Sequence, residues 1–214
     1  MNEPNRTHSA RGPLASWILG EREEIVLASA SPRRRELLER LGIPARLAPV
    51  VIDEQFPEGA EPREGARVVA VRKIEAARAA GVSGLLLGAD TAVVHGDTVL
   101  GKPRDAAEAR AMLARLSSHR HVVVTGVALL DESGRLASGA ETTDVRFRAL
   151  SKGEIDDYVR TGEPLDKAGA YGIQGLGALL VREIRGDYTN VVGLPIGLLL
   201  NLARQLPVRR KDSA

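Results

Sequence analysis

The stretch IVLASASPRRRELLERLG, residues 25–42, is the part of the chain from which the rest is best interpreted. Its first four residues are typical of a short buried strand. Ser31 followed by Pro32 is typical of a helix start, with serine as the N-cap and proline in the first turn. Leucines then recur at helical spacing as far as Gly42, which suits a helix end. The stretch therefore predicts a strand that leads directly into a helix.

The predicted helix start carries three consecutive arginines, Arg33, Arg34 and Arg35. Cations are mildly unfavourable there, because the first turn already holds the positive end of the helix dipole. The arginines, the hydroxyls of Ser29 and Ser31 and the free backbone N–H groups fit together if an anion binds among them. A phosphate or polyphosphate is the expected anion, and a solvated basic turn is the alternative.

Composition describes an ordinary globular protein: 214 residues, 43% hydrophobic and 27% charged. This length fits one large domain or two small lobes. The net charge is only +2, from 30 basic and 28 acidic residues, and aromatic residues make up 3%, so nucleic acid is not the expected partner. With no cysteine, the chain has neither disulfides nor thiolate metal sites.

The two ends of the chain differ from its middle. Residues 1–23 are mostly polar and predict a flexible extension, and residues 208–214 form a basic tail, which leaves 24–207 as a single domain. No apolar run approaches the roughly 20 residues of a membrane span, and the N-terminus lacks the order of a signal peptide. The expected location is the cytoplasm, without a membrane partner.

Strand and helix signals alternate along the domain. Strands are expected at 85–94, 122–130, 136–147 and 178–184, and helices at 67–80, after Asp105, from Ser151 to Arg160, and from about Pro195. The adjacent strands 122–130 and 136–147 are typical of a hairpin. The pattern predicts a mixed α/β fold, in which a twisted sheet with antiparallel pairs is flanked by helices.

Asp90 interrupts the apolar strand 85–94, where an unpaired carboxylate would be costly to bury. It must therefore be hydrogen-bonded, paired with a cation or bound to a metal. A catalytic or metal-binding role is favoured if Asp90 lies at the carboxyl end of its strand, where α/β sheets place ligands. A strand-end cap or a structural ion pair is the alternative.

Further candidates flank this strand in sequence. Lys73 and Lys102 could aim ammonium groups at the same phosphate, although surface lysines are common. Glu54, beside Asp53 in a polar loop, could supply a ligand to Mg²⁺, and a solvated acidic loop is the equal alternative. His119 and His121 would share a strand face, but without a third ligand they are expected to be structural or surface residues.

The segment 164–175, PLDKAGAYGIQG, has the composition of a ligand-binding loop. Its glycines permit close backbone approach, while Asp166, Lys167 and Gln174 supply charge and an amide. The P-loop pattern is absent, and a structural glycine-rich turn is the alternative.

Five motifs in order resemble the Maf family, the septum-formation-inhibitor-related nucleoside triphosphate pyrophosphatases. They are SASPRR from Ser29, GADT from Gly88, GKP from Gly101, DKAGAYGIQG from Asp166 and GDYTNVVGLP from Gly186. The resemblance implies a fold like that of the inosine triphosphate pyrophosphatases, with two lobes around a nucleotide cleft. It implies hydrolysis of a nucleoside triphosphate to the monophosphate and pyrophosphate, with a divalent cation, and suggests a homodimer.

The resemblance also assigns roles. The proton-accepting aspartate of the family falls on Asp90. The branch that acts on dTTP and UTP, as opposed to 7-methyl-GTP, is marked by residues that here are Arg33, Thr91 and Gln174. The phosphates are then expected to meet Ser29, Ser31, Arg34, Lys73, Lys102 and Lys167, and Mg²⁺ or Mn²⁺ to meet Asp90 and Glu54.

The expected function is therefore a dTTP/UTP pyrophosphatase, which could extend to modified pyrimidine nucleotides in a house-cleaning role. Asp90 could act as the base, as a metal ligand or as both. The alternative function is a nucleotide-binding regulator of septum formation that acts through protein partners.

Overall fold

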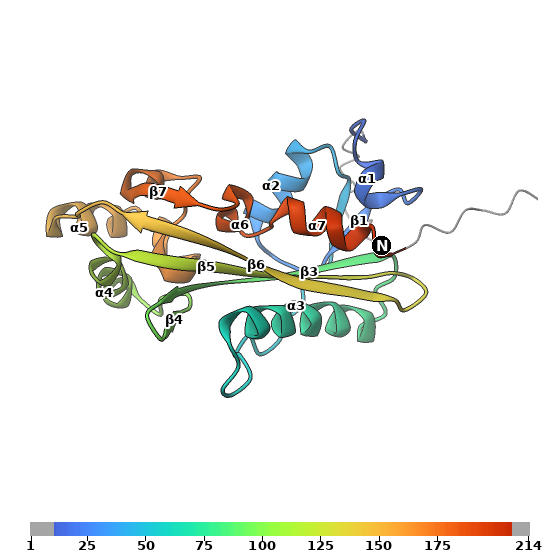
Figure 1. The fold of residues 1–214 in the computed structure, drawn as a ribbon, viewed down its shortest axis with the longest axis horizontal. Coiled ribbons are helices and arrows are strands. Elements are labelled where there is room, and N and C mark those ends of the chain that lie inside the picture. Colours follow the sequence, from blue (N-terminus) through green and yellow to red (C-terminus); the bar gives the residue numbers. More distant parts are fainter. Residues whose placement is uncertain (1–10, 207–214) are drawn as a thin grey trace, which may run out of the picture.

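A twisted sheet of seven strands organises the computed structural model, which describes residues 11–206 (Figure 1). The strand order is β2-β1-β3-β5-β6-β7, and β4 lies beside β3. The strands are β1 (Ile25–Leu27), β2 (Ala45–Leu47), β3 (Leu85–His95), β4 (Thr98–Leu100), β5 (Arg120–Leu130), β6 (Leu136–Phe147) and β7 (Val181–Arg185). Strands β1, β2 and β3 are parallel and the other pairs are antiparallel, which confirms the predicted mixed sheet.

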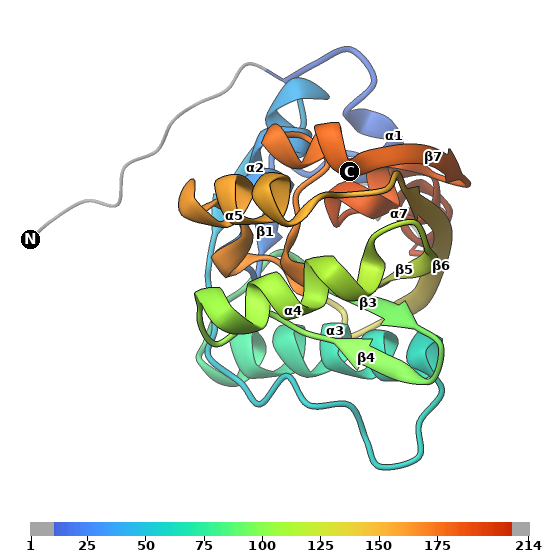
Figure 2. The ribbon, with the colours of Figure 1, turned by 90° about the vertical axis from the view of Figure 1, so that its left-hand side faces the viewer.

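Helices cover both faces of the sheet. They are α1 (Ser16–Leu19), α2 (Pro32–Arg40), α3 (Pro62–Ala79), α4 (Ala106–Leu116), α5 (Lys152–Arg160), α6 (Tyr188–Val192) and α7 (Ile196–Ala203), with 3-10 turns η1 (Glu163–Asp166), η2 (Ala168–Ala170) and η3 (Leu176–Leu180). Helix α3 runs along one face, and α2, α6 and α7 lie on the other (Figure 1). Helices α4 and α5 pack together at one end of the sheet (Figure 2).

Three of the predicted helix starts, those of α2, α4 and α5, are confirmed. Helix α2 begins at Pro32 after an extended Ser31, although the serine hydroxyl makes no capping bond. The Asp105 side chain caps α4 by accepting from the Glu108 amide. Ser151 and Glu154 form a reciprocal capping box at α5.

Two boundaries differ from the prediction. Helix α3 begins at Pro62, five residues before the predicted start, because proline suits a first turn and Gly65 gives the Phe56 ring the space that a Cβ atom would occupy. The strand predicted at 178–184 begins only at Val181, after the turn η3. Helix α6 was not predicted.

The prediction of a flexible extension over 1–23 is wrong for the part that the structure describes. Ala15, Ile18 and Leu19, in and beside α1, are buried in the same apolar cluster as β1 and α7. Burial of these side chains ties the segment to the domain. Residues 1–10 of the predicted extension and the basic tail 208–214 lie outside the described residues. Across residues 11–206, no helix has the length and apolarity needed to cross a membrane.

Two apolar clusters form the two lobes. One joins α1, α2 and α7 to β1 and the first half of β3, from Leu85 to Ala89. The other joins α4, α5 and the turn η2 to β4. A third cluster, under α3, spans β1, β3 and β5 on the opposite face. The sheet therefore carries two apolar clusters along its long strands, and Val181 and Val191 pack against both of them.

Strand β3 has two different neighbours along one edge. Parallel β1 pairs with Leu85 to Leu87, and antiparallel β4 pairs with Val93 to His95. On the other edge, β5 pairs with β3 without interruption from Leu86 to Val94. The edge segment from Gly88 to Ala92 is therefore left without a strand partner on one side, and Asp90 lies at its centre.

Candidate functional site

A cleft of about 1000 Å³ opens at this uncovered edge of β3. Its walls come from the β1–α2 turn, the loop 50–56, the centre of β3, the turn after β4 and the glycine-rich segment 166–174. The residues that the sequence analysis assigned to a site come from several separate segments of the chain and meet in this cleft. The lining includes Ser29, Ser31, Arg33, Arg34, Glu54, Lys73, Asp90, Thr91, Lys102, Lys167 and Gln174.

Asp90 lies in the middle of an eleven-residue strand and not at a strand end. Its side chain points to the face that α3 covers, and glycines flank it there. A Cβ atom at Gly88 or at Gly126 would overlap with the backbone carbonyl of Ala70 or of Ala66. The glycines let α3 approach the sheet closely beside Asp90, so residues of α3 reach the carboxylate.

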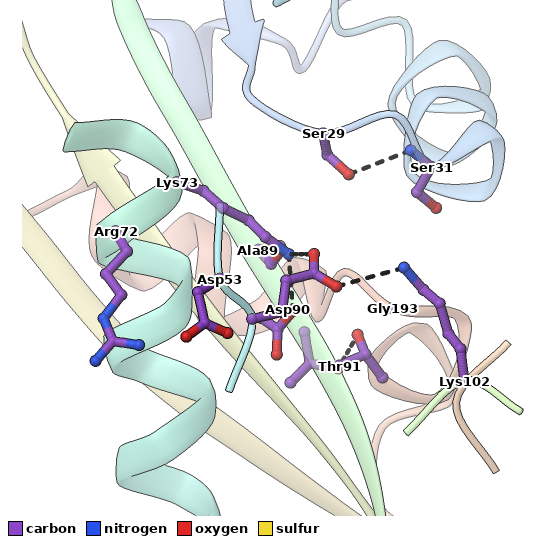
Figure 3. A network of polar contacts seen from close by, with 12 residues as sticks. Ser29, Ser31, Asp53, Arg72, Lys73, Ala89, Asp90, Thr91, Lys102 and Gly193 are labelled. Atoms are coloured by element: carbon purple, nitrogen blue, oxygen red, sulfur yellow. Dashed lines mark hydrogen bonds and ion pairs between the residues drawn. The ribbon is translucent and has the colours of Figure 1, made fainter. Parts of the chain in front are cut away.

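Lys73 of α3 makes that contact (Figure 3). Its ammonium lies 2.7 Å from Asp90 Oδ1, 2.6 Å from Glu54 Oε1 and 3.2 Å from the carbonyl oxygen of Ala89. Lys73 is 5% exposed, so the two carboxylates offset the cost of burying its charge. The ammonium expected to contact phosphate is instead surrounded by three protein oxygens.

Glu54 is shared between two lysines. Its Oε2 atom lies 3.4 Å from the ammonium of Lys102, whose side chain is 60% exposed. Partial burial of Glu54 opposes ionisation, but the hydrogen bond and charge of Lys73, with a smaller contribution from Lys102, hold the pKa of Glu54 below its ordinary value. Lys73, Asp90, Glu54 and Lys102 form what we call the ionic end of the cleft.

Thr91 points to the opposite face of the sheet from Asp90. Its hydroxyl accepts a hydrogen bond from Arg34 and lies 3.0 Å from the hydroxyl of Thr125, which donates to the Asn190 carbonyl. Thr125 and Asn190 are fully buried. This network of hydrogen bonds fixes the Thr91 hydroxyl against buried residues on the side of the sheet opposite Asp90.

The three arginines of the β1–α2 turn have three different environments. Arg34 is buried and donates to neutral oxygens only: the Gly193 carbonyl and the hydroxyls of Ser29 and Thr91. Burial lowers the pKa of Arg34 to about 10, against the opposing charge of Asp90, so its guanidinium remains charged at neutral pH. Arg35 is exposed and pairs with Glu39 on α2.

Arg33 crosses the mouth of the cleft. Its Nη1 atom lies 3.5 Å from Asp166 Oδ2 on η1. Lys167 lies 2.6 Å from the other oxygen of Asp166 and also donates to the Glu163 carbonyl. Arg33 and Lys167 are therefore joined through one exposed carboxylate.

Gln174 lies in the glycine-rich segment between Gly172 and Leu176. Its side-chain oxygen Oε1 is buried and has no hydrogen-bond partner within residues 11–206. A buried carbonyl oxygen without a donor is costly, so this atom is suited to an external N–H group.

Glu163 and Tyr158 were missed by the sequence analysis. The Glu163 carboxylate accepts from the backbone amides of Leu176 and Gly177 and from the Tyr158 hydroxyl. No pattern in the sequence distinguishes Glu163 from the other glutamates of the chain. We call Glu163, Tyr158, Gln174 and the segment 172–177 the loop end of the cleft.

His121 lies beneath this loop end. It is 2% exposed, and its Nε2 atom lies 2.9 Å from the hydroxyl of the cleft residue Tyr171. Burial lowers the pKa of His121 to about 4, so the ring is neutral at neutral pH. His119 is exposed at the start of β5, and a structural or surface role remains the expectation for both histidines.

Within the part of the chain that the structure describes, no cluster of three or more histidine, aspartate or glutamate side chains could hold an ion. Asp90 and Glu54 do converge, since both contact the same ammonium. Two carboxylates fit a hard cation such as Mg²⁺ when phosphate oxygens complete its ligands.

A mixed α/β sheet with cations from several segments gathered around a buried carboxylate defines a class: α/β proteins with a cleft suited to an anionic ligand. Similarity to known proteins identifies the family within this class. A family model described as Maf-like protein matches residues 24–206, and the chain belongs to this family.

Relatives named dTTP/UTP pyrophosphatase are similar over most of their length. The protein of Moorella thermoacetica is 53% identical over 175 residues, covering 81% of this chain and 90% of the relative. That of Halalkalibacterium halodurans is 49% identical over 80% of this chain and 90% of the relative. Among solved structures, the Staphylococcus aureus Ham1 protein overlaps 58% of this chain and 71% of its own, with 16% identity and a TM-score of 0.39.

Proposed function

We propose that this chain is a nucleoside triphosphate pyrophosphatase that hydrolyses dTTP and UTP to the monophosphate and pyrophosphate. The observation that carries the proposal is the position of Asp90 in one cleft with Arg33, Thr91 and Gln174. Relatives named for this activity and about half identical to the chain support it.

Asp90 is the proposed proton acceptor. Lys73 holds its Oδ1 atom, and within residues 11–206 no side chain or amide donates to its Oδ2 atom. A water molecule bound to Oδ2 would attack the α-phosphorus while its proton passes to Asp90. The bond from the α-phosphorus to the oxygen that bridges to the β-phosphate then breaks, and pyrophosphate leaves.

The cations of the cleft are the proposed phosphate ligands. Arg34 has five N–H groups, of which its protein contacts use three, so two remain for a phosphate oxygen. Lys102 is exposed and its contact with Glu54 is long, so its ammonium can turn to a phosphate. Ser29, Ser31 and Lys167 line the same walls. Lys73 was expected to bind phosphate as well, and its proposed contribution is indirect: it positions the carboxylates of Asp90 and Glu54.

Asp90 and Glu54 are the proposed ligands of Mg²⁺ or Mn²⁺. A divalent cation, when bound, would neutralise charge on the α-phosphate and on the pyrophosphate leaving group. Lys73 contributes by keeping the two carboxylates close to each other, at 2.6 and 2.7 Å from its ammonium.

Gln174 is the proposed reader of the base. Its unpartnered Oε1 atom accepts a hydrogen bond, and the N3–H group of uracil or thymine is a suitable donor. A polar pocket of this kind discriminates strongly, because a base without the donor leaves the buried oxygen unpaired. Arg33, at the mouth of the cleft, is placed to contact the same nucleotide.

The proposal extends to the setting of the enzyme. Residues 24–207 form the catalytic domain of the enzyme. The enzyme acts in the cytoplasm as a homodimer. It binds neither nucleic acid nor a membrane. The net charge of +2 supports the first of these exclusions. Sedimentation of the full chain at several concentrations measures the oligomeric state.

A panel of purified triphosphates tests the activity. With Mg²⁺, we expect UTP and dTTP to yield the monophosphate and pyrophosphate, identified by phosphorus NMR. Release of single phosphates would contradict the pyrophosphatase assignment. Fast turnover of 7-methyl-GTP without turnover of UTP or dTTP would contradict the assignment to the pyrimidine branch.

A further inference from the structure

We propose that Glu163 is a positioning residue, whose carboxylate fixes the segment 172–177 so that the Gln174 side chain faces the cleft in one orientation. The inference rests on the proposed function and adds to it the residue that sets base selectivity from outside the cleft. Glu163 is not among the residues that line the cleft.

The hydrogen bonds of Glu163 hold the loop at its far end. Oε2 accepts from the Leu176 amide at 2.9 Å, and Oε1 accepts from the Gly177 amide at 3.0 Å. Oε1 also accepts from the Tyr158 hydroxyl at 2.9 Å. The same hydroxyl accepts from the Gly172 amide at 3.1 Å, so Glu163 and Tyr158 together hold both ends of the segment that carries Gln174.

Two of the three glycines of the segment lie against these two side chains. A Cβ atom at Gly175 would overlap with the Glu163 carboxylate, and one at Gly177 would overlap with the Tyr158 hydroxyl. Neither glycine is at a position that only glycine can adopt by its φ angle. Gly175 and Gly177 therefore leave room for Glu163 and Tyr158, whereas Gly172 leaves room for the Lys167 side chain.

The charge of Glu163 suits this task. Partial burial opposes ionisation, but the amides of Gly177 and Leu176 lower the pKa of Glu163 below its ordinary value. Burial raises the pKa of Tyr158, so this hydroxyl stays protonated and donates. A carboxylate accepts every hydrogen bond that its neighbours here offer, and the corresponding amide cannot.

Gln174 needs such support because it has no internal partner for Oε1. A loop that keeps a buried carbonyl oxygen unpaired before the ligand arrives must be held by other contacts. The contacts of Glu163 and Tyr158 on both sides of Gln174 provide them.

A double-mutant cycle with Glu163→Gln and Gln174→Ala tests the coupling. In Glu163→Gln one carboxylate oxygen becomes an NH₂ group that faces a backbone N–H, and we expect kcat/KM for UTP to fall about tenfold, mainly through KM. In the Gln174→Ala background the same change should cost less than about twofold. An equal loss in both backgrounds would overturn the proposal, because Glu163 would then act independently of Gln174.

A second variant covers the case in which Glu163→Gln does not fold. Tyr158→Phe removes only the hydroxyl, and it should show the same non-additivity with Gln174→Ala. The matched control is Asp157→Asn, which alters an exposed carboxylate on the same helix, paired with Arg160, and should leave kcat/KM unchanged.

Amide hydrogen exchange separates this proposal from the proposed function. We expect the amides of Leu176 and Gly177 to exchange at least about tenfold faster in Glu163→Gln, whatever the substrate of the enzyme. Faster exchange in a protein that does not hydrolyse UTP or dTTP would leave Glu163 as the anchor and refute the activity. Unchanged exchange would refute the anchor in either case.

Discussion

The ionic end and the loop end of the cleft are built in opposite ways. At the ionic end, Lys73 of α3 and Asp90 of β3 contact each other through side chains that project from regular elements. At the loop end, a side chain, Glu163, holds irregular backbone in place through amide hydrogen bonds. Figure 3 shows the first arrangement, in which the strand and the helix fix both partners.

The difference assigns different tasks to the two ends. Groups on a strand and a helix are held within narrow limits, which suits the reacting atoms of a hydrolysis. A loop tolerates changes of sequence and length without disturbing the core, which suits the choice of base. We therefore expect damage at the ionic end to abolish turnover, and damage at the loop end to alter selectivity and stability.

The largest expected effect is that of Asp90→Asn. The amide keeps the size of the side chain but cannot accept a proton, so kcat should fall at least about 10²-fold. Steady-state assays with UTP measure the change, and circular dichroism checks the fold. Asp97→Asn, in the exposed turn between β3 and β4, is the matched control, and equal activity of the two variants would end the proposed role of Asp90.

The second expected effect is a pH dependence of stability that arises from His121, beneath the loop end. The pKa of His121 is about 4 in the folded protein against 6.5 in the unfolded chain, so the unfolded chain binds this proton first as the pH falls. The free energy of unfolding should therefore decrease between pH 6.5 and pH 4, by about 3 kcal/mol from this group.

Urea unfolding at several pH values measures the decrease, with His121→Gln as the comparison. The variant should lose less stability than the wild type over this range. Because Tyr171, whose hydroxyl contacts His121, directly precedes segment 172–177, the protection factor of the Gly172 amide, corrected for the intrinsic exchange rate at each pH, should fall with acidity. Parallel pH profiles of the two proteins would contradict the prediction.

The third effect is on stability at the ionic end. Lys73→Met leaves Asp90 and Glu54 close together without the ammonium between them, and we expect a loss of about 2 kcal/mol. The half-exposed position of Glu54 keeps the loss below that of a fully buried pair. Lys102→Met, at a longer and more exposed contact with Glu54, is the control in urea unfolding and should lose less than about 0.5 kcal/mol.

The smallest effect is expected from Asp166→Asn, which breaks the contact between Arg33 and η1. The two atoms are 3.5 Å apart and the Asp166 side chain is 61% exposed, so the loss of stability should stay below about 0.5 kcal/mol. Thermal unfolding measures it. Because the substitution also weakens the contact between Asp166 and Lys167, a loss above about 1 kcal/mol would contradict the prediction for both contacts.

Asp90 and the arginines of the β1–α2 turn could be found in the sequence because they break local rules. Asp90 interrupts an apolar strand, and three arginines stand at a helix start where cations are unfavourable. Residues that conflict with local rules in this way are usually explained by function or by contacts with distant parts of the chain. The pairing of Lys73 with Asp90 and Glu54 could not be predicted, because it depends on the close approach of α3 at Gly88 and Gly126.

The loop end was only half predictable. Its glycines and Gln174 stood out, but Glu163 follows ordinary surface composition, and its role comes from backbone amides that any sequence would supply. The same limit explains the error at α1. The few apolar side chains at 15, 18 and 19 did not predict burial among their polar sequence neighbours. They are buried because α7, which is distant in sequence, belongs to the same apolar cluster.

The uncovered edge of β3 also has a consequence for how the chain folds. The half of β3 beside β4 can pair as soon as a tight turn closes, whereas the half beside β1 must wait for a strand far earlier in the chain, with Leu27 opposite Leu87. Pairings between distant segments form slowly because loop closure costs entropy. We therefore expect the walls around Asp90 to be complete only once β1 has paired with β3, so that on refolding hydrolysis should return no earlier than this pairing.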